Sequence, residues 1–152
     1  MIKTLLILFS SLPIIALAHD QQHLLLPIVS VYDGDTIKTK FPLPFPLDDM
    51  EIRILGIDTP EMPAESYLTT GKLGRAKCKK EAELAITAKN TVKDLAKQHD
   101  NTMIVKNYFW DKYGSRINGD VYFGNVKVAE QLLKLNMAVP YFGGTKTKNW
   151  CL

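Results

Sequence analysis

The segment from Met50 to Glu61 constrains the fold of this chain more than any other stretch. Ile52 and Ile54 are β-branched and flank Arg53, so the segment favours a strand in which Arg53 faces away from both isoleucines. Pro60 lacks the N–H group that a strand inside a sheet would donate. The strand must therefore end before Pro60, and the chain turns directly after it.

The residues at this turn carry charges of both signs. Asp58, Thr59 and Glu61 follow the strand, and Arg53 lies within it. Binding and catalytic residues are common in the loops that follow strands. A guanidinium group beside two carboxylates can hold a phosphate and a hard metal ion together. The same charges are also typical of a solvated strand end, so this segment alone leaves both interpretations open.

Residues 1–18 have the features of a secretory signal peptide. Lys3 precedes an apolar run from Leu5 to Leu17, and Ala16-Leu17-Ala18 matches a small-residue cleavage site. The run is too short for a membrane span and has no stop-transfer sequence after it. We expect export to the periplasm or the medium, a single domain over residues 19–152, and no stable membrane insertion after cleavage. A retained N-terminal anchor is the alternative.

The two cysteines fit an exported chain. Cys78 and Cys151 allow one bridge, and an oxidising compartment favours that bridge over two free thiols. The disulfide would tie the C-terminal tail to the first predicted helix. The net charge of +3 is a mild bias and does not by itself indicate a nucleic-acid partner.

The remaining pattern predicts five strands and two helices. The strands are expected at 24–31, 36–41, 50–58, 102–110 and 116–123, and the helices at 75–99 and 128–135. Pro42, Pro44 and Pro46 predict an extended excursion, and a loop is expected over 62–74. This order favours a mainly β protein with helices (α+β), built as a five-stranded Greek-key barrel of the OB type. Such barrels bind oligonucleotides or oligosaccharides, although a fold alone does not establish activity.

Three motifs resemble the signature of the micrococcal nuclease (thermonuclease-like) family. They are Val-Tyr-Asp-Gly-Asp-Thr-Ile at 31–37, Ile-Arg-Ile-Leu-Gly-Ile-Asp-Thr-Pro-Glu at 52–61, and Asp-Lys-Tyr-Gly-Ser-Arg at 111–116. Their order and spacing cover nearly all of the chain after residue 18. The resemblance implies an OB-fold barrel with calcium-dependent phosphodiesterase activity on DNA, RNA or both, and we expect a monomer.

The resemblance also implies which residues hold the metal. Asp35 and Asp58 match the carboxylates that bind calcium, and Thr59 matches the position that supplies a backbone carbonyl. Asp33 matches an acidic position near the ion. Without the resemblance, Asp33 and Asp35 would be read first as residues that favour a tight turn.

The catalytic roles follow in the same way. Glu61 matches the general base, and Arg53 and Arg116 match the phosphate-binding arginines. Ser115 departs from the family pattern, which often has arginine directly after glycine. An additional residue in a strand reverses the side-chain direction unless a bulge or a longer turn absorbs it.

The substrate contacts are the remaining expectation. Lys112 and Tyr113 match positions that line the nucleotide site, although both are also ordinary turn residues. Tyr141 is the best candidate for stacking on a base, as aromatic side chains do in such barrels.

Two other functions are compatible with this fold. One is a catalytically silent OB module that binds nucleic acid or oligosaccharide. The other is an exported structural or calcium-binding interaction domain. The presence of Arg53, Glu61 and Arg116 together argues against the silent module, because binding alone needs no general base.

Overall fold

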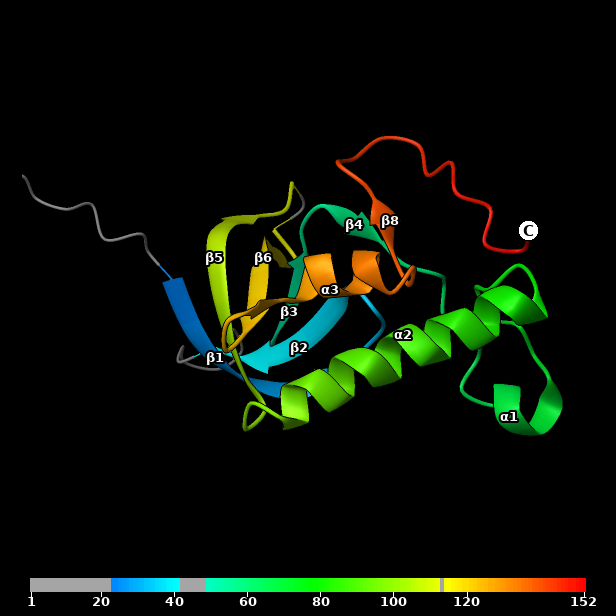
Figure 1. Cartoon of the computed structure of the whole chain (residues 1–152), viewed down its shortest axis with the longest axis horizontal. Coiled ribbons are helices and arrows are strands. Elements are labelled where there is room, and N and C mark those ends of the chain that lie inside the picture. The colour runs from blue at the N-terminus through cyan, green and yellow to red at the C-terminus, as the bar shows by residue number, and fades with distance from the viewer. Residues whose placement is uncertain (1–22, 42–48, 113) are drawn as a thin grey trace, which may run out of the picture.

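Five strands close into a mixed β-barrel in the computed structural model, which describes residues 23–41, 49–112 and 114–152 (Figure 1). The strands are β1 (His23–Val31), β2 (Thr36–Lys40), β3 (Asp49–Ile54), β5 (Thr102–Trp110) and β6 (Ile117–Phe123). They follow the order β3-β2-β1-β5-β6 through antiparallel pairs, and a parallel β3–β6 pair closes the barrel. The predicted α+β architecture with a five-stranded barrel is confirmed.

The barrel interior is filled by alternate side chains of the strands. Ile37, Ile52 and Val121 have no exposed surface, and Ile54 and Val105 are also buried. Each such side chain contributes about 1.5–3 kcal/mol when it leaves water. Because period-two alternation sends the intervening residues outward, the charged residues of β2 and β3 are placed outside this core.

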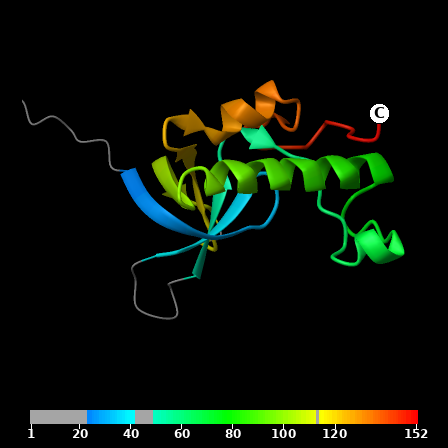
Figure 2. The same ribbon diagram turned by 60° about the horizontal axis from the view of Figure 1, so that its bottom comes forward.

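The long helix α2 (Lys79–Lys97) packs on the barrel through small side chains. Its buried face carries Ala82, Ala85, Ala88 and Val92, which let the helix approach closely. In two views α2 runs past the barrel toward the short helix α1 (Tyr67–Thr70) (Figure 2). The sequence correctly predicts a long helix here but begins it at residue 75, four residues too early.

A third helix and three short strands complete the described fold. Helix α3 (Val128–Lys134) follows β7 (Val126–Lys127) and ends before Asn136, whose φ of 56° is the left-handed conformation that often follows a helix. The strands β4 (Ile57–Asp58) and β8 (Val139–Pro140) pair with each other.

The predicted third strand is in fact two strands. The chain turns at Leu55 and Gly56, and the φ of +80° at Gly56 is a conformation that glycine adopts readily. The β-branched Ile57 hides this turn in the sequence because it continues the apolar pattern. The expected loop at 62–74 likewise contains α1, whose four residues are too few to show a helical period.

Some expectations lie outside the described residues. These are the signal peptide at 1–18, the extended segment with Pro42, Pro44 and Pro46, and Tyr113. Within the described ranges, no helix has the length and apolar character needed to cross a membrane.

The disulfide between Cys78 and Cys151 is formed, with a Cα–Cα distance of 6.0 Å. Cys78 lies before the first residue of α2 and not on the buried face of the helix. It is the residue that caps the start of the helix, and its sulfur accepts a hydrogen bond from the Glu81 N–H at 3.4 Å. Trp150, beside Cys151, is only 7% exposed, so the end of the tail is packed as well as cross-linked.

We expect Gly119→Ala to destabilise the barrel by about 1–3 kcal/mol, because it overpacks the core. A Cβ atom on Gly119 would lie 2.4 Å from Cγ1 of Val105 on the neighbouring strand. Urea unfolding of a double-mutant cycle with Val105→Ala isolates this contact. Gly119→Ala should cost less when residue 105 is already alanine; an equal cost in both backgrounds would contradict this packing.

Candidate functional site

A cavity of about 1120 Å³ opens at the barrel rim beside β2, β3 and the C-terminal tail. Its lining brings together most of the residues that the sequence singles out: Asp33, Asp35, Arg53, Thr59, Glu61, Arg116 and Tyr141. Asp58 lines a smaller adjoining cavity of about 260 Å³, which shares Tyr141 and Lys146 with the first. The candidate residues therefore share one region of the molecule.

The turn between β1 and β2 presents the first acidic residues. The Asp35 N–H donates to Oδ1 of Asp33 at 3.1 Å, which is the local turn that aspartate favours. Gly34 lets this turn lie against Thr59, since a Cβ atom there would be 2.8 Å from Cγ2 of Thr59. The turn and the site are thus the same structure, and neither interpretation of Asp33 and Asp35 excludes the other.

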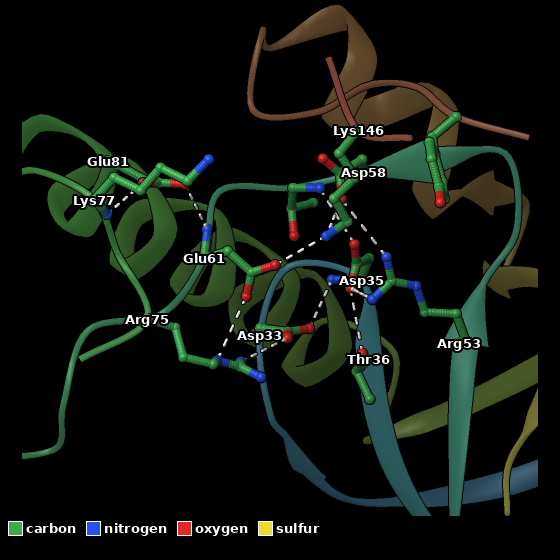
Figure 3. A network of polar contacts seen from close by, with 12 residues as sticks. Asp33, Asp35, Thr36, Arg53, Asp58, Glu61, Arg75, Lys77, Glu81 and Lys146 are labelled. Carbon is green, nitrogen blue, oxygen red and sulfur yellow. Dashed lines mark hydrogen bonds and ion pairs between the residues drawn. The ribbon is translucent and has the colours of Figure 1, made fainter. Parts of the chain in front are cut away.

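Arg53 joins two buried carboxylates (Figure 3). Its Nη1 lies 2.5 Å from Oδ1 of Asp35, and its Nη2 lies 3.8 Å from Oδ1 of Asp58. Asp35 also accepts from the Thr59 N–H at 3.2 Å and from the Thr36 hydroxyl at 3.2 Å. These contacts fasten the ends of three segments, β2, β3 and β4, around one guanidinium group.

The environment of Asp35 disfavours its negative charge. Burial raises the pKa of the Asp35 carboxyl to about 7; Arg53 opposes this rise, and the negative charges of Asp33 and Asp58 add to it. One arginine is therefore not enough to compensate the buried acidic groups at this position. A divalent cation would supply the missing positive charge.

Glu61 is surrounded by cations. Its Oε1 lies 2.9 Å from Nζ of Lys146, and its Oε2 lies 3.4 Å from Nε of Arg75. Burial pushes the pKa of Glu61 upward, but the hydrogen bond and charge of Lys146, followed by the charges of Arg75 and Arg53, outweigh burial and lower it. Glu61 is thus held in the ionised form, which is the form a general base requires.

Arg116 lies on the cavity side of β6 despite Ser115. The turn absorbs Ser115, whose N–H and hydroxyl donate to the Asp111 carboxylate at 3.0 and 3.3 Å. Arg116 has the same strand parity as Asn118, and both line the cavity. Nε of Arg116 lies 3.3 Å from Oδ2 of Asp111, and 39% of its side chain is exposed, against 19% for Arg53.

The expected substrate contacts are only partly assembled. Tyr141 lines both cavities, but its hydroxyl already donates to the Gly144 carbonyl at 2.7 Å. Lys112 lies in the turn before β6 and is not among the residues that line either cavity. Tyr113 is outside the described residues.

Three residues of the site were missed from the sequence: Arg75, Glu81 and Lys146. The Glu81 carboxylate accepts from the Lys77 N–H at 2.6 Å and the Glu61 N–H at 3.3 Å, so it supports the backbone of the candidate base. Its place three residues after Cys78 resembles a capping box and was a usable signal. Arg75 and Lys146 carry no comparable signal, because they reach the site only through the tertiary fold.

The residues present fit a hard cation. In the described part of the chain, no group of three or more histidine, cysteine, aspartate or glutamate side chains forms a metal cluster. Asp35 and Asp58 nevertheless face one guanidinium, and Oδ1 of Asp58 is buried without a hydrogen bond of acceptable geometry. Two carboxylates, the adjacent Thr59 backbone and water are an oxygen set of the kind that calcium accepts.

We expect the unfolding free energy of Asp35→Asn to rise relative to that of wild type as the pH increases from 5 to 8 in metal-free buffer. The folded pKa of about 7 exceeds the ordinary pKa of an aspartate side chain in the unfolded chain, so the folded protein retains a proton that the unfolded chain releases, and stability falls as the pH rises between these two pKa values. The unfolding free energy of wild type should fall by about 2–3 kcal/mol relative to that of Asp35→Asn over this pH interval.

Urea unfolding of wild type and Asp35→Asn at both pH values, with chelator present, measures this difference. Asp94→Asn, an exposed carboxylate paired with Lys97, is the control and should show no comparable trend. Parallel pH profiles for wild type and Asp35→Asn would contradict the assignment of this titration to Asp35.

A comparison with known families agrees with this arrangement. The family model of the staphylococcal nuclease homologue matches residues 51–150, which include Arg53, Asp58, Glu61 and Arg116. No curated protein matches the chain. The match covers more than half of the chain, and Asp35, which precedes it, contacts Arg53 within it. The chain therefore belongs to the staphylococcal nuclease homologue family.

Proposed function

We propose that this protein is an exported calcium-dependent nuclease that hydrolyses phosphodiester bonds of DNA, RNA or both. One observation carries the proposal: Arg53 holds two buried carboxylates at the rim of a cavity that Glu61 and Arg116 also line. This set combines a cation site, a base and phosphate-binding groups. A binding module would need only the last of these.

Asp35, Asp58 and the backbone of Thr59 would hold the calcium ion. When bound, calcium neutralises a non-bridging phosphate oxygen and polarises phosphorus. Burial disfavours the free carboxylate of Asp35, so a cation at this position also relieves the cost of its ionisation.

Glu61 would take the proton of the attacking water. The cations around it keep it ionised, and its backbone is held by Glu81 at 3.3 Å. About a third of its side chain is exposed, so water can reach the carboxylate. A base that is ionised, positioned and accessible meets the geometric requirements of general base catalysis.

Arg53 and Arg116 would bind the phosphate from the cavity wall. A guanidinium group is planar and permanently charged, and it pairs with phosphate through two parallel hydrogen bonds. Negative charge grows on the phosphate oxygens as the water attacks, so these arginines stabilise the transition state more than the substrate. Tyr141 and, with less support from its position, Lys112 would contact the nucleotide.

We expect Glu61→Gln to reduce the cleavage rate by about 10²–10⁴-fold, because glutamine cannot accept the proton. Cleavage of DNA and RNA in calcium, and in chelator, measures the rate. Fluorescence anisotropy with labelled DNA should show that association is retained. Glu65→Gln, an exposed glutamate outside the cavity lining, is the matched control.

The same assay separates the alternatives. Calcium-dependent cleavage by wild type supports the nuclease, whereas association without cleavage would indicate the silent binding module. Neither cleavage nor association would indicate an interaction domain. A normal rate in Glu61→Gln would remove Glu61 as the base.

We expect Arg116→Ala to lower kcat by about 10²-fold with a smaller change in KM, because the lost interaction strengthens in the transition state. Arg116 is partly exposed, so its loss should leave the fold intact. Steady-state kinetics and a thermal unfolding curve test both points. A change confined to KM would show that Arg116 only binds the substrate.

A further inference from the structure

The C-terminal tail is anchored at both ends and passes over the site. We call residues 141–150 the strap. At one end, β8 pairs with β4, and the Tyr141 N–H donates to the Gly56 carbonyl at 2.9 Å. At the other end, Trp150 is buried and Cys151 is bonded to Cys78 at the start of α2. The strap leads from β8 toward that end of the helix (Figure 1).

Lys146 lies near the middle of the strap, and its side chain reaches the carboxylates of Asp58 and Glu61. Its Nζ is 2.7 Å from Oδ1 of Asp58 and 2.9 Å from Oε1 of Glu61. Figure 3 shows its side chain between these two carboxylates. The ammonium group therefore contacts both a proposed calcium ligand and the proposed base.

A divalent cation and Lys146 make competing demands on Asp58. Oδ1 of Asp58 is buried, and it forms ion pairs with Lys146 at 2.7 Å and with Arg53 at 3.8 Å. A calcium ion bound to this oxygen would stand beside the ammonium group, and two positive charges at such short range repel. Calcium binding at Asp58 thus requires that Lys146 withdraw.

We propose that Lys146 is an intramolecular competitor of calcium for Asp58 and that the Cys78–Cys151 disulfide keeps it in place. The inference rests on the proposed calcium site. Anchoring the strap at both ends raises the effective concentration of the ammonium group at the carboxylates. The calcium affinity of the protein is then set partly by its tail. Reduction of the disulfide raises this calcium affinity.

The test is the calcium dissociation constant, measured by calorimetry on the folded full-length mature protein. Lys146→Met keeps the length of the side chain and removes its charge, and we expect it to bind calcium about tenfold more tightly. Lys146→Gln should behave in the same way. Lys148→Met is the matched control, since Lys148 lies in the same strap but contacts the Trp150 ring at 5.4 Å.

The disulfide is tested with reductant and with Cys151→Ser. Cys151 is the better position to change, because the Cys78 sulfur also caps α2. Reductant, or the Cys151→Ser substitution, should tighten calcium binding when residue 146 is lysine, to a smaller extent than Lys146→Met does. Neither should change calcium binding when residue 146 is already methionine. Circular dichroism establishes that each protein remains folded.

The outcomes are distinct. Unchanged or weaker binding by Lys146→Met, with wild type still binding calcium, overturns the competition and leaves the proposed nuclease standing. An equal effect of reductant on wild type and Lys146→Met overturns the role of the disulfide. Failure of every protein to bind calcium overturns the competition together with the calcium dependence of the proposed function.

Discussion

The ion pair between Arg53 and Asp35 is the interaction on which the site depends. It joins a strand of the barrel to the turn that precedes β2, and it places a permanent positive charge beside two buried carboxylates. Asp35 is buried, so removing Arg53 would leave its carboxyl group without its nearest cation, which is more costly than losing an exposed salt bridge. The fold and the proposed chemistry are therefore coupled through the same guanidinium group.

The charges around this pair come both from the barrel strands and from segments outside the barrel. Arg53, Asp35 and Asp58 lie on or beside barrel strands, whereas Arg75 and Lys146 arrive from outside the barrel. Barrel residues are held by packing and by the hydrogen bonds of the sheet. Arg75 and Lys146 reach the site from outside that framework, and their side chains are 54% and 41% exposed, against 19% for Arg53.

Much of the barrel could be predicted from sequence because its strands are rich in β-branched, aromatic and other apolar residues and are bounded by turn signals. The pattern defines β1, β2, β5 and β6 within one residue at most of their ends. The short strand β8 was missed, and β4 was merged with β3 into one predicted strand, since two residues cannot display a period. Only one pairing is possible for two cysteines, so the disulfide required no geometry to predict.

The candidate site was predictable only where its residues are close in sequence or carry a motif. Arg53, Asp58 and Glu61 fall within nine residues, and Asp35 belongs to a turn motif. Lys146 is 85 residues from Glu61, in a tail whose composition predicts neither helix nor strand. Its position at the site follows from the pairing of β8 with β4 and from the disulfide, which no local pattern reveals.

The most direct measurement is a crystal structure of the protein with calcium and an uncleavable phosphorothioate dinucleotide. We predict a cation in contact with Asp35 and Asp58. We also predict the phosphorothioate group within hydrogen-bonding distance of both Arg53 and Arg116. A cation bound away from these carboxylates, or a nucleotide bound away from both arginines, would contradict the proposed active site.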